Sequence, residues 1–183
     1  MLRLIGICLT LAGSFGSGLA FCREKSRHAG TLFLLAELFW RMAEEIGYSA
    51  ERLPDVFSQM SVWLAKDAEN DSFGKEEASA LAEALLHCAD RLERSEPLEV
   101  VWNAELGAWA AQTVLSREEA KKLLSFAKEQ GFPDRERQRQ WMLRLSGEFK
   151  SRAESVFEKA ASEKRMVLSV SLAAGALVVV LFW

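Results

Sequence analysis

The last 18 residues, Met166–Trp183, read MVLSVSLAAGALVVVLFW and contain no charged side chain. As an α-helix they would rise about 27 Å, close to the roughly 30 Å hydrocarbon thickness of a bilayer. Only Ser169 and Ser171 interrupt the apolar run, and a serine hydroxyl in a helix can bond back to its own backbone. We therefore expect residues 166–183 to form a C-terminal transmembrane helix.

The helical pattern of this segment begins well before the apolar run, near Asp134. No proline follows that residue, so we expect one helix of about 50 residues, or roughly 75 Å, that continues into the membrane. Its apolar stripe at helical spacing comprises Trp141, Leu145, Phe149, Val156 and Ala160.

The polar side of this last helix is rich in arginine and has two interpretations. It is either a solvated helix surface or a docking face for an acidic partner or for anionic lipid headgroups. Its basic residues are Arg135, Arg137, Arg139, Arg144, Lys150, Arg152, Lys159, Lys164 and Arg165.

Residues 4–21, LIGICLTLAGSFGSGLAF, form a second uncharged run near the N-terminus. Basic residues follow it directly, and positive charge there resists translocation, which favours a retained transmembrane helix over residues 1–21. A cleaved signal peptide is the alternative, because Gly18-Leu19-Ala20 has small residues at cleavage-like positions.

The charges next to the two apolar runs predict the topology. Basic residues follow the first run and precede the second, so we expect the body between them, residues 22–165, to lie in the cytosol. The residues expected at the membrane interface are Arg23, Lys25, Arg27, Lys164 and Arg165.

Apolar residues of the body recur at helical spacing, and no strand-like alternation interrupts them. Breaks divide the body into about six helices, which predicts an all-α antiparallel bundle with a last helix that is long and continuous into the membrane. The breaks are Gly47 with Pro54, residues 70–72, residues 95–97, the capping box Ser116–Glu119, and Gly131 with Pro133. The first body helix carries its stripe at Leu32, Leu35, Ala36, Phe39, Trp40, Ala43 and Ile46.

Little in the sequence indicates catalysis. The formal net charge of −3 argues against nucleic-acid binding, and the three cysteines show no paired or metal-binding spacing. His87 and Cys88 are neighbours on one helix and point about 100° apart, so they cannot act as a dyad. A lipid-active or proton-linked membrane enzyme would need ionisable groups in the apolar runs, which offer only Cys8. We therefore expect no enzyme activity, cofactor, metal or small-molecule substrate.

Two sets of motifs resemble those of one family. Glu45-Ile46-Gly47-Tyr48, followed by Leu53-Pro54 and Phe57, resembles the E-I-x-Y and L-P-x-x-F signature of the stage III sporulation protein AB family. Phe126, Gly131, Asp134 and Gln138 resemble that family's F-x-x-x-L-G-x-x-D-x-x-x-Q motif, with Gln130 in place of its leucine. The resemblance covers nearly the whole chain, including the apolar segments at both ends.

The resemblance implies a non-enzymatic scaffold in the membrane channel complex that links the mother cell and the forespore, with its body in the mother-cell cytoplasm. It also implies a fold similar to the cytosolic domain of type II secretion platform proteins. The partners it implies are membrane lipids, other stage III sporulation channel proteins and, as one candidate, the secretion-type ATPase. A membrane-tethered helical adaptor with another cytosolic partner, outside sporulation, is the alternative.

On this interpretation the motif residues are candidates for partner binding. Up-and-down connectivity would bring the turns after the first and fifth helices to the same end of the bundle, away from the membrane. The alternative is that the motifs only stabilise the two turns. The candidate residues are Glu45, Tyr48, Leu53, Pro54, Phe57, Phe126, Gly131, Asp134 and Gln138.

Overall fold

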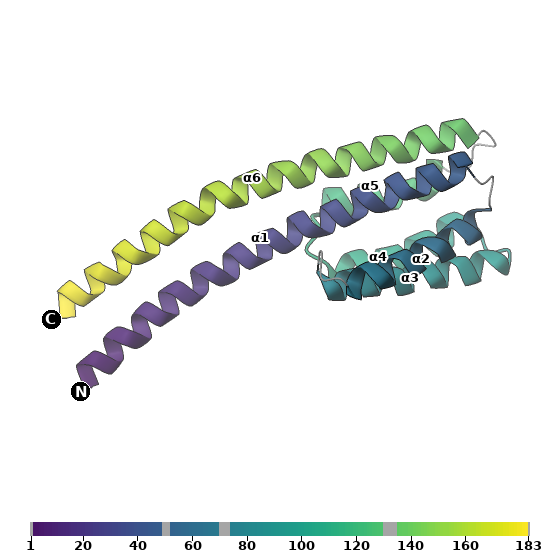
Figure 1. The fold of residues 1–183 in the computed structure, drawn as a ribbon. Helices are drawn as coiled ribbons and strands as arrows, with labels where there is room; N and C mark the ends of the chain where they lie inside the picture. Colours follow the sequence, from purple (N-terminus) through teal and green to yellow (C-terminus); the bar gives the residue numbers. More distant parts are fainter. Residues whose placement is uncertain (1, 49–51, 70–73, 130–134, 183) are drawn as a thin grey trace.

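The computed structural model describes residues 2–48, 52–69, 74–129 and 135–182, and these form six α-helices without a strand. The side chains described are those of 24–48, 52–66, 68, 74–128, 135–162 and 169. The predicted all-α class is therefore confirmed for this part of the chain (Figure 1). The helices are α1 (Leu2–Tyr48), α2 (Leu53–Glu69), α3 (Lys75–Glu93), α4 (Leu98–Gln112), α5 (Arg117–Glu129) and α6 (Arg135–Phe182).

Two helices are much longer than the others. α6 has 48 residues, which confirms the single long helix expected from Asp134 onward. α1 has 47 residues, so the N-terminal helix and the first body helix are one element. The sequence between them contains good helix formers such as Arg23, Lys25 and Arg27, and a lone glycine, Gly30, costs only about 1 kcal/mol, so nothing there forces a break.

A search of the described residues finds no helix with an apolar stretch long enough to cross a membrane. The two predicted transmembrane segments, residues 4–21 and 166–183, lie outside the described side chains apart from Ser169. Their assignment to the membrane remains a prediction.

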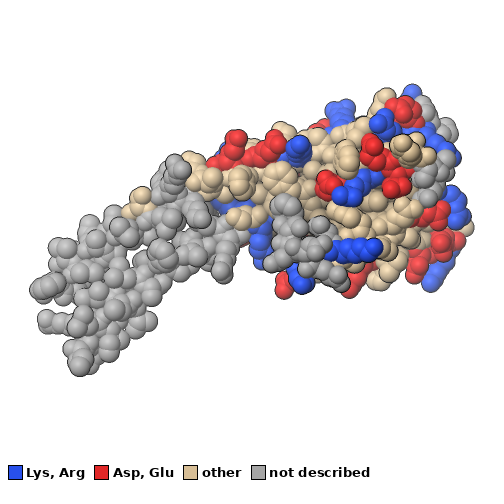
Figure 2. All heavy atoms as spheres, viewed as in Figure 1, with Lys and Arg blue, Asp and Glu red and all other residues tan. Residues whose placement is uncertain are grey.

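The six helices run alternately up and down, and each packs against the next one in the sequence, while α6 packs against α1. The ends of α1 and α6 that carry the chain termini lie together at one side of Figure 1. We call the end of the bundle nearer the termini the proximal end and the opposite one the distal end. Figure 2 shows that lysine, arginine, aspartate and glutamate side chains are mixed over the distal part of the visible face.

Four aromatic rings from four different helices meet at the centre of the bundle. The Trp102 and Phe126 ring centroids are 4.5 Å apart, and Phe57 packs on both rings. Phe39 of α1 packs on Phe126 at 5.4 Å. The indole N–H of Trp102 donates to the backbone carbonyl of Leu123 at 3.0 Å, so this buried polar group is satisfied.

The contact between α1 and α6 closes the bundle. Phe39 and Phe149 stack with nearly parallel rings, 5.8 Å between centroids. The Ser146 hydroxyl donates a hydrogen bond of 2.7 Å to the backbone carbonyl of Ala36. A small residue at position 146 thus lets the two backbones approach closely, with the buried hydroxyl satisfied.

The start of α3 requires a glycine. Gly74 has φ of 50°, in the left-handed region that disfavours side chains, and a Cβ there would lie 2.6 Å from the Glu77 carboxylate. Gly147 of α6 has ordinary helical geometry, and a Cβ there would meet nothing within 4 Å.

We predict opposite effects for alanine at these two glycines. Gly74→Ala should lower the free energy of unfolding by roughly 1–2 kcal/mol, because it adds backbone strain and displaces Glu77. Gly147→Ala should raise it by about 0.5–1 kcal/mol through helix propensity alone. Denaturant unfolding of the purified full-length chain measures both; a stabilised Gly74→Ala variant would contradict the structure of this turn.

A candidate partner-binding end and a proximal ion-pair cluster

The C-terminal ends of α1 and α5 lie at the same distal end of the bundle, as the up-and-down topology predicts. Near the end of α1, the Glu44 carboxylate lies 3.7 Å from the Arg139 guanidinium at the start of α6. The Arg139 side chain also packs against Gly47, so closely that a Cβ added at Gly47 would lie 3.1 Å from the Arg139 side chain. The two motif regions are therefore brought together.

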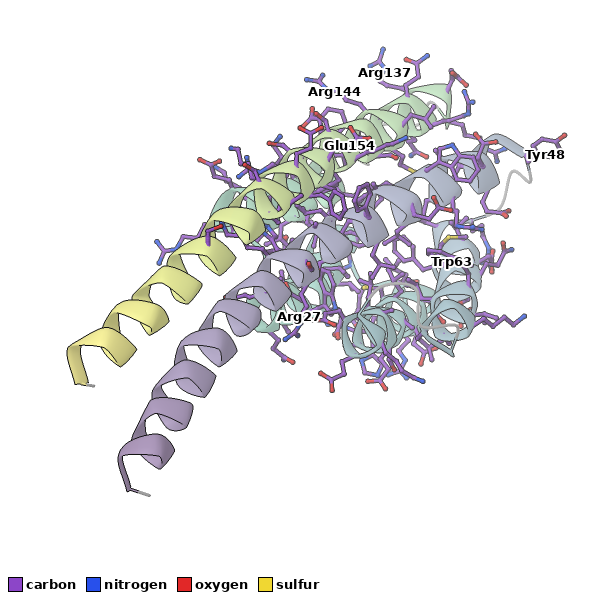
Figure 3. All side chains as sticks on the ribbon, turned by 60° about the vertical axis from the view of Figure 1, so that its left-hand side comes forward. Arg27, Tyr48, Trp63, Arg137, Arg144 and Glu154 are labelled. Carbon is purple, nitrogen blue, oxygen red and sulfur yellow. The ribbon has the colours of Figure 1, made fainter. Side chains whose placement is uncertain are left out.

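The motif residues at this end differ in exposure. Tyr48 is 95% exposed and projects from the end of α1 (Figure 3). Glu45, Leu53, Pro54 and Gln138 are half-buried, so each retains accessible surface. Gly131 and Asp134 lie outside the described residues.

Phe57 and Phe126, the aromatic residues of the two motifs, are fully buried. Their ring centroids are 6.5 Å apart, so they connect the two motif regions through the core. In this structure they contribute packing and hold the exposed motif residues in place.

Arg41 and Trp63 lie on the neighbouring surface of α1 and α2. The Arg41 guanidinium sits 4.4 Å from the centre of the Trp63 ring and also binds Glu37 at 2.8 Å. This cation–π contact joins the two helices beside the distal end.

At the proximal end, five side chains from four helices form what we call the proximal ion-pair cluster. The adjacent residues Arg27 and His28 of α1 bind two different glutamates, each the third residue of its helix. The Arg27 Nε lies 2.9 Å from Glu77 of α3, and the His28 Nε2 lies 2.8 Å from Glu119 of α5. Arg152 of α6 donates to Glu119 at 3.0 Å.

Glu119 is the centre of this cluster and is only 4% exposed. It completes the predicted capping box: the Ser116 amide donates to its carboxylate at 2.8 Å, and its own amide donates to the Ser116 hydroxyl at 3.3 Å. Burial alone would raise the pKa of Glu119, but the bonds from Ser116, His28 and Arg152 outweigh it and lower this pKa to about 2. The carboxylate therefore stays ionised at neutral pH.

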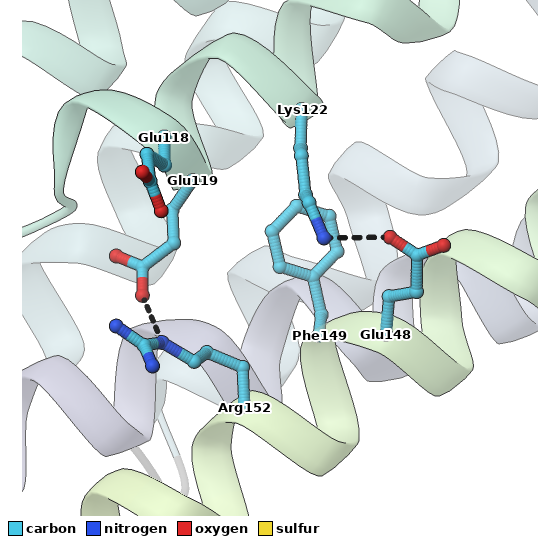
Figure 4. Close-up of a pocket in the computed structure, with 6 residues that line it drawn as sticks. All are labelled: Glu118, Glu119, Lys122, Glu148, Phe149 and Arg152. Carbon is cyan, nitrogen blue, oxygen red and sulfur yellow. Dashed lines mark hydrogen bonds and ion pairs between the residues drawn. The ribbon is translucent and has the colours of Figure 1, made fainter.

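A small cavity of about 170 Å³ lies between α5 and α6 beside this cluster (Figure 4). Phe149 lies between two ion pairs, Arg152 with Glu119 and Lys122 with Glu148, the second at 2.7 Å. The Lys122 ammonium, with Arg144, lowers the pKa of Glu148. Both cations that line the cavity therefore have carboxylate partners within the bundle. The sixth lining residue is Glu118.

The structure adds a partner for one predicted membrane-interface residue. Arg27 binds Glu77 within the bundle, and Lys25 is half-buried. The side chains of Arg23, Lys164 and Arg165 lie outside the described ones. The sequence did show a capping box at Ser116, but it gave no sign that the same glutamate also binds α1 and α6.

The neighbours His87 and Cys88 have separate surroundings. The Cys88 thiol is fully buried, and burial raises its pKa to about 12, so it is unreactive at neutral pH. The His87 Nδ1 faces Glu105 at 3.4 Å. Within the described ranges, no group of three or more histidine, cysteine or acidic residues could hold a metal ion.

We predict that Glu119→Gln lowers the free energy of unfolding by roughly 1–3 kcal/mol at neutral pH, because charged hydrogen bonds are lost. The folded-state pKa of about 2 lies below the ordinary value of 4.5. The ionised carboxylate therefore stabilises the fold above about pH 4.5, and this stabilisation disappears as the pH falls toward 2. Unfolding at several pH values measures it, with the exposed neighbour Glu118→Gln as the control. A parent–variant difference that stayed constant down to pH 2 would count against this role.

Comparison with known proteins agrees with the motifs found in the sequence. A profile of the family described as stage III sporulation protein AB matches residues 3–183. Neither the curated proteins nor the solved structures provide a match. Because the family match extends over nearly the whole chain, the protein belongs to the stage III sporulation protein AB family.

Proposed function

We propose that the protein is a non-enzymatic membrane scaffold of the secretion-like channel complex that links mother cell and forespore during endospore formation. Membership of a sporulation family over residues 3–183 is the observation that carries this proposal. The buried Cys88 and the paired cations around the cavity agree with a structural role, because neither offers an activated group.

Three segments make up the proposed arrangement: an N-terminal transmembrane helix over residues 1–21, a cytosolic body over 22–165, and a C-terminal transmembrane helix over 166–183. The continuity of α1 and α6 supports it, because each helix runs without a break from the bundle into one of the apolar segments. α1 and α6 extend beyond the bundle side by side from the same end (Figure 1), as insertion of both segments in one membrane requires. The body would face the mother-cell cytoplasm.

The distal end is the proposed surface for the other channel proteins, with the secretion-type ATPase as the first candidate. Tyr48 supports this proposal, because a large aromatic side chain that is 95% exposed contributes little to the fold. Gln138 of α6 lies at the same end and remains half-exposed. A partner at this end would approach from the cytoplasm, away from the bilayer.

The membrane assignment predicts that the full-length chain sediments with membranes and resists extraction by alkaline carbonate. It also predicts the orientation of the body. Glu83→Cys on α3 and Glu99→Cys on α4, each introduced alone into a Cys8→Ser, Cys22→Ser background that keeps the buried Cys88, should react with a membrane-impermeant maleimide only after the cytosolic side is opened. Labelling of these cysteines in intact cells would show that the body faces the outside, opposite to the proposed topology. Release of the chain from membranes by carbonate would exclude the transmembrane anchors.

The distal surface predicts that Tyr48→Ala and Gln138→Ala each weaken binding of the cognate secretion-type ATPase about tenfold, or roughly 1.4 kcal/mol, with the free energy of unfolding nearly unchanged. Phe157→Ala is a matched control, since Phe157 is also an exposed aromatic residue but lies on α6 five residues beyond Arg152, away from the distal end. Binding by the purified full-length chain and spore counts in an endospore-forming host measure the effect. Loss of stability without a specific loss of binding would instead assign the motifs to the turns.

A further inference from the structure

α3 exposes a row of carboxylates on one face. Glu76, Glu83 and Asp90 are spaced seven residues apart, which places them along one side of the helix at intervals of about 10.5 Å. All three are exposed, and within the described part of the chain none has an ion-pair partner. The outer face of α3 is therefore acidic.

α6 exposes arginines with the same spacing. Arg137 and Arg144 are also seven residues apart, and Figure 3 shows both projecting from the same side of α6, away from α1. The Arg144 side chain is 68% exposed and binds Glu148 of its own helix at 3.2 Å. Such an exposed ion pair is worth only a few tenths of a kcal/mol, so Arg144 can exchange its partner at low cost.

The order of the helices places these two faces on opposite sides of the bundle. Each helix packs against its neighbours in sequence and α6 closes against α1, so α3 and α6 lie across the bundle from each other. One copy therefore presents an acidic side and a basic side in opposite directions. This is the arrangement that a head-to-tail contact between identical chains needs.

The two rows also lie at matching heights above the proximal ion-pair cluster. Arg27 and His28 are adjacent in α1, and they bind Glu77 and Glu119. Arg152 also binds Glu119. Glu77 and Arg152 therefore lie at nearly the same height along the bundle. Glu83 then lies about 9 Å and Arg144 about 12 Å above that level, at the helical rise of 1.5 Å per residue.

The second pair, Asp90 and Arg137, lies about 20 Å and about 22 Å above that level by the same rise. Opposite charges on two copies standing at equal height would thus face each other within a side chain's reach.

An apolar residue lies within each charged row. Leu86 of α3, between Glu83 and Asp90 in sequence, is 47% exposed. Trp141 of α6, between Arg137 and Arg144, is half-buried with the Arg144 guanidinium 5.6 Å from its ring centre. An apolar centre with a charged rim is the usual composition of a specific protein interface.

We propose that the chain associates with further copies of itself head-to-tail, the acidic α3 face of one copy against the basic α6 face of the next. Glu83 pairs with Arg144 and Asp90 pairs with Arg137. The copies stand at equal height because every copy is anchored in one membrane, and this anchoring is part of the proposed function. Repeated contacts of this kind build a ring or an arc in the membrane plane.

Cross-linking of two differently tagged full-length copies in membranes tests the proposal. One copy carries Glu83→Cys, the other Arg144→Cys, both in a Cys8→Ser, Cys22→Ser background that keeps the buried Cys88. A short bis-maleimide should join the two copies, whereas either copy alone should give little product. Ala104→Cys is the matched control for Glu83→Cys, because Ala104 is exposed on α4 and lies at nearly the same height, five residues before Trp109, which binds the Glu77 carbonyl.

Charge reversal then tests whether the proposed pairs hold the contact. Asp90→Arg in the first copy should lower the yield about tenfold, because it would place like charges opposite each other. Arg137→Glu in the second copy should restore it. Three results would each overturn the proposal. They are cross-linking of the Glu83→Cys copy to itself, a cross-linking yield that stays the same with Asp90→Arg, and the absence of a product from every pair of copies. Carbonate extraction tests the anchoring separately, so the two failures are distinguishable.

Discussion

The carboxylate of Glu119 holds together more of this structure than any other polar group described. It caps its own helix through Ser116 and binds His28 of α1 and Arg152 of α6. Removal of a buried carboxylate from water is unfavourable, and only the sum of these bonds reverses the effect on its pKa. The start of α5 is thereby fixed against the two long helices at the level where they leave the bundle.

The sequence predicts the helices well because their signals are local. The capping box at Ser116, the uninterrupted pattern after Asp134 and the glycine near the end of α1 each require only neighbouring residues, and the structure places helix ends at or near all of them. A difference from the sequence prediction, the fusion of the N-terminal segment to the first body helix, arises where helix-forming residues leave no stop signal.

The contacts between helices could not be read in the same way. Arg27 and Glu77 are 50 residues apart, and His28 and Glu119 are 91 apart. Whether such residues meet depends on how each helix is rotated about its axis, which the packing of Phe39, Phe57 and the other core rings decides. The same rotation buries the aromatic residues of the two motifs and leaves Tyr48 in solvent, although the motif pattern treats them alike.

The hydrogen bond between Ser146 and Ala36 spans 110 residues of chain, which has a consequence for biosynthesis. Helices α2 to α5 pack mainly on sequence neighbours, so they can assemble as the chain leaves the ribosome. α1 must wait for α6, which is translated last. During that interval the side of α1 that α6 covers, including the face of Phe39 that stacks on Phe149, stays exposed, and exposed apolar surface of this kind favours aggregation of a newly made chain.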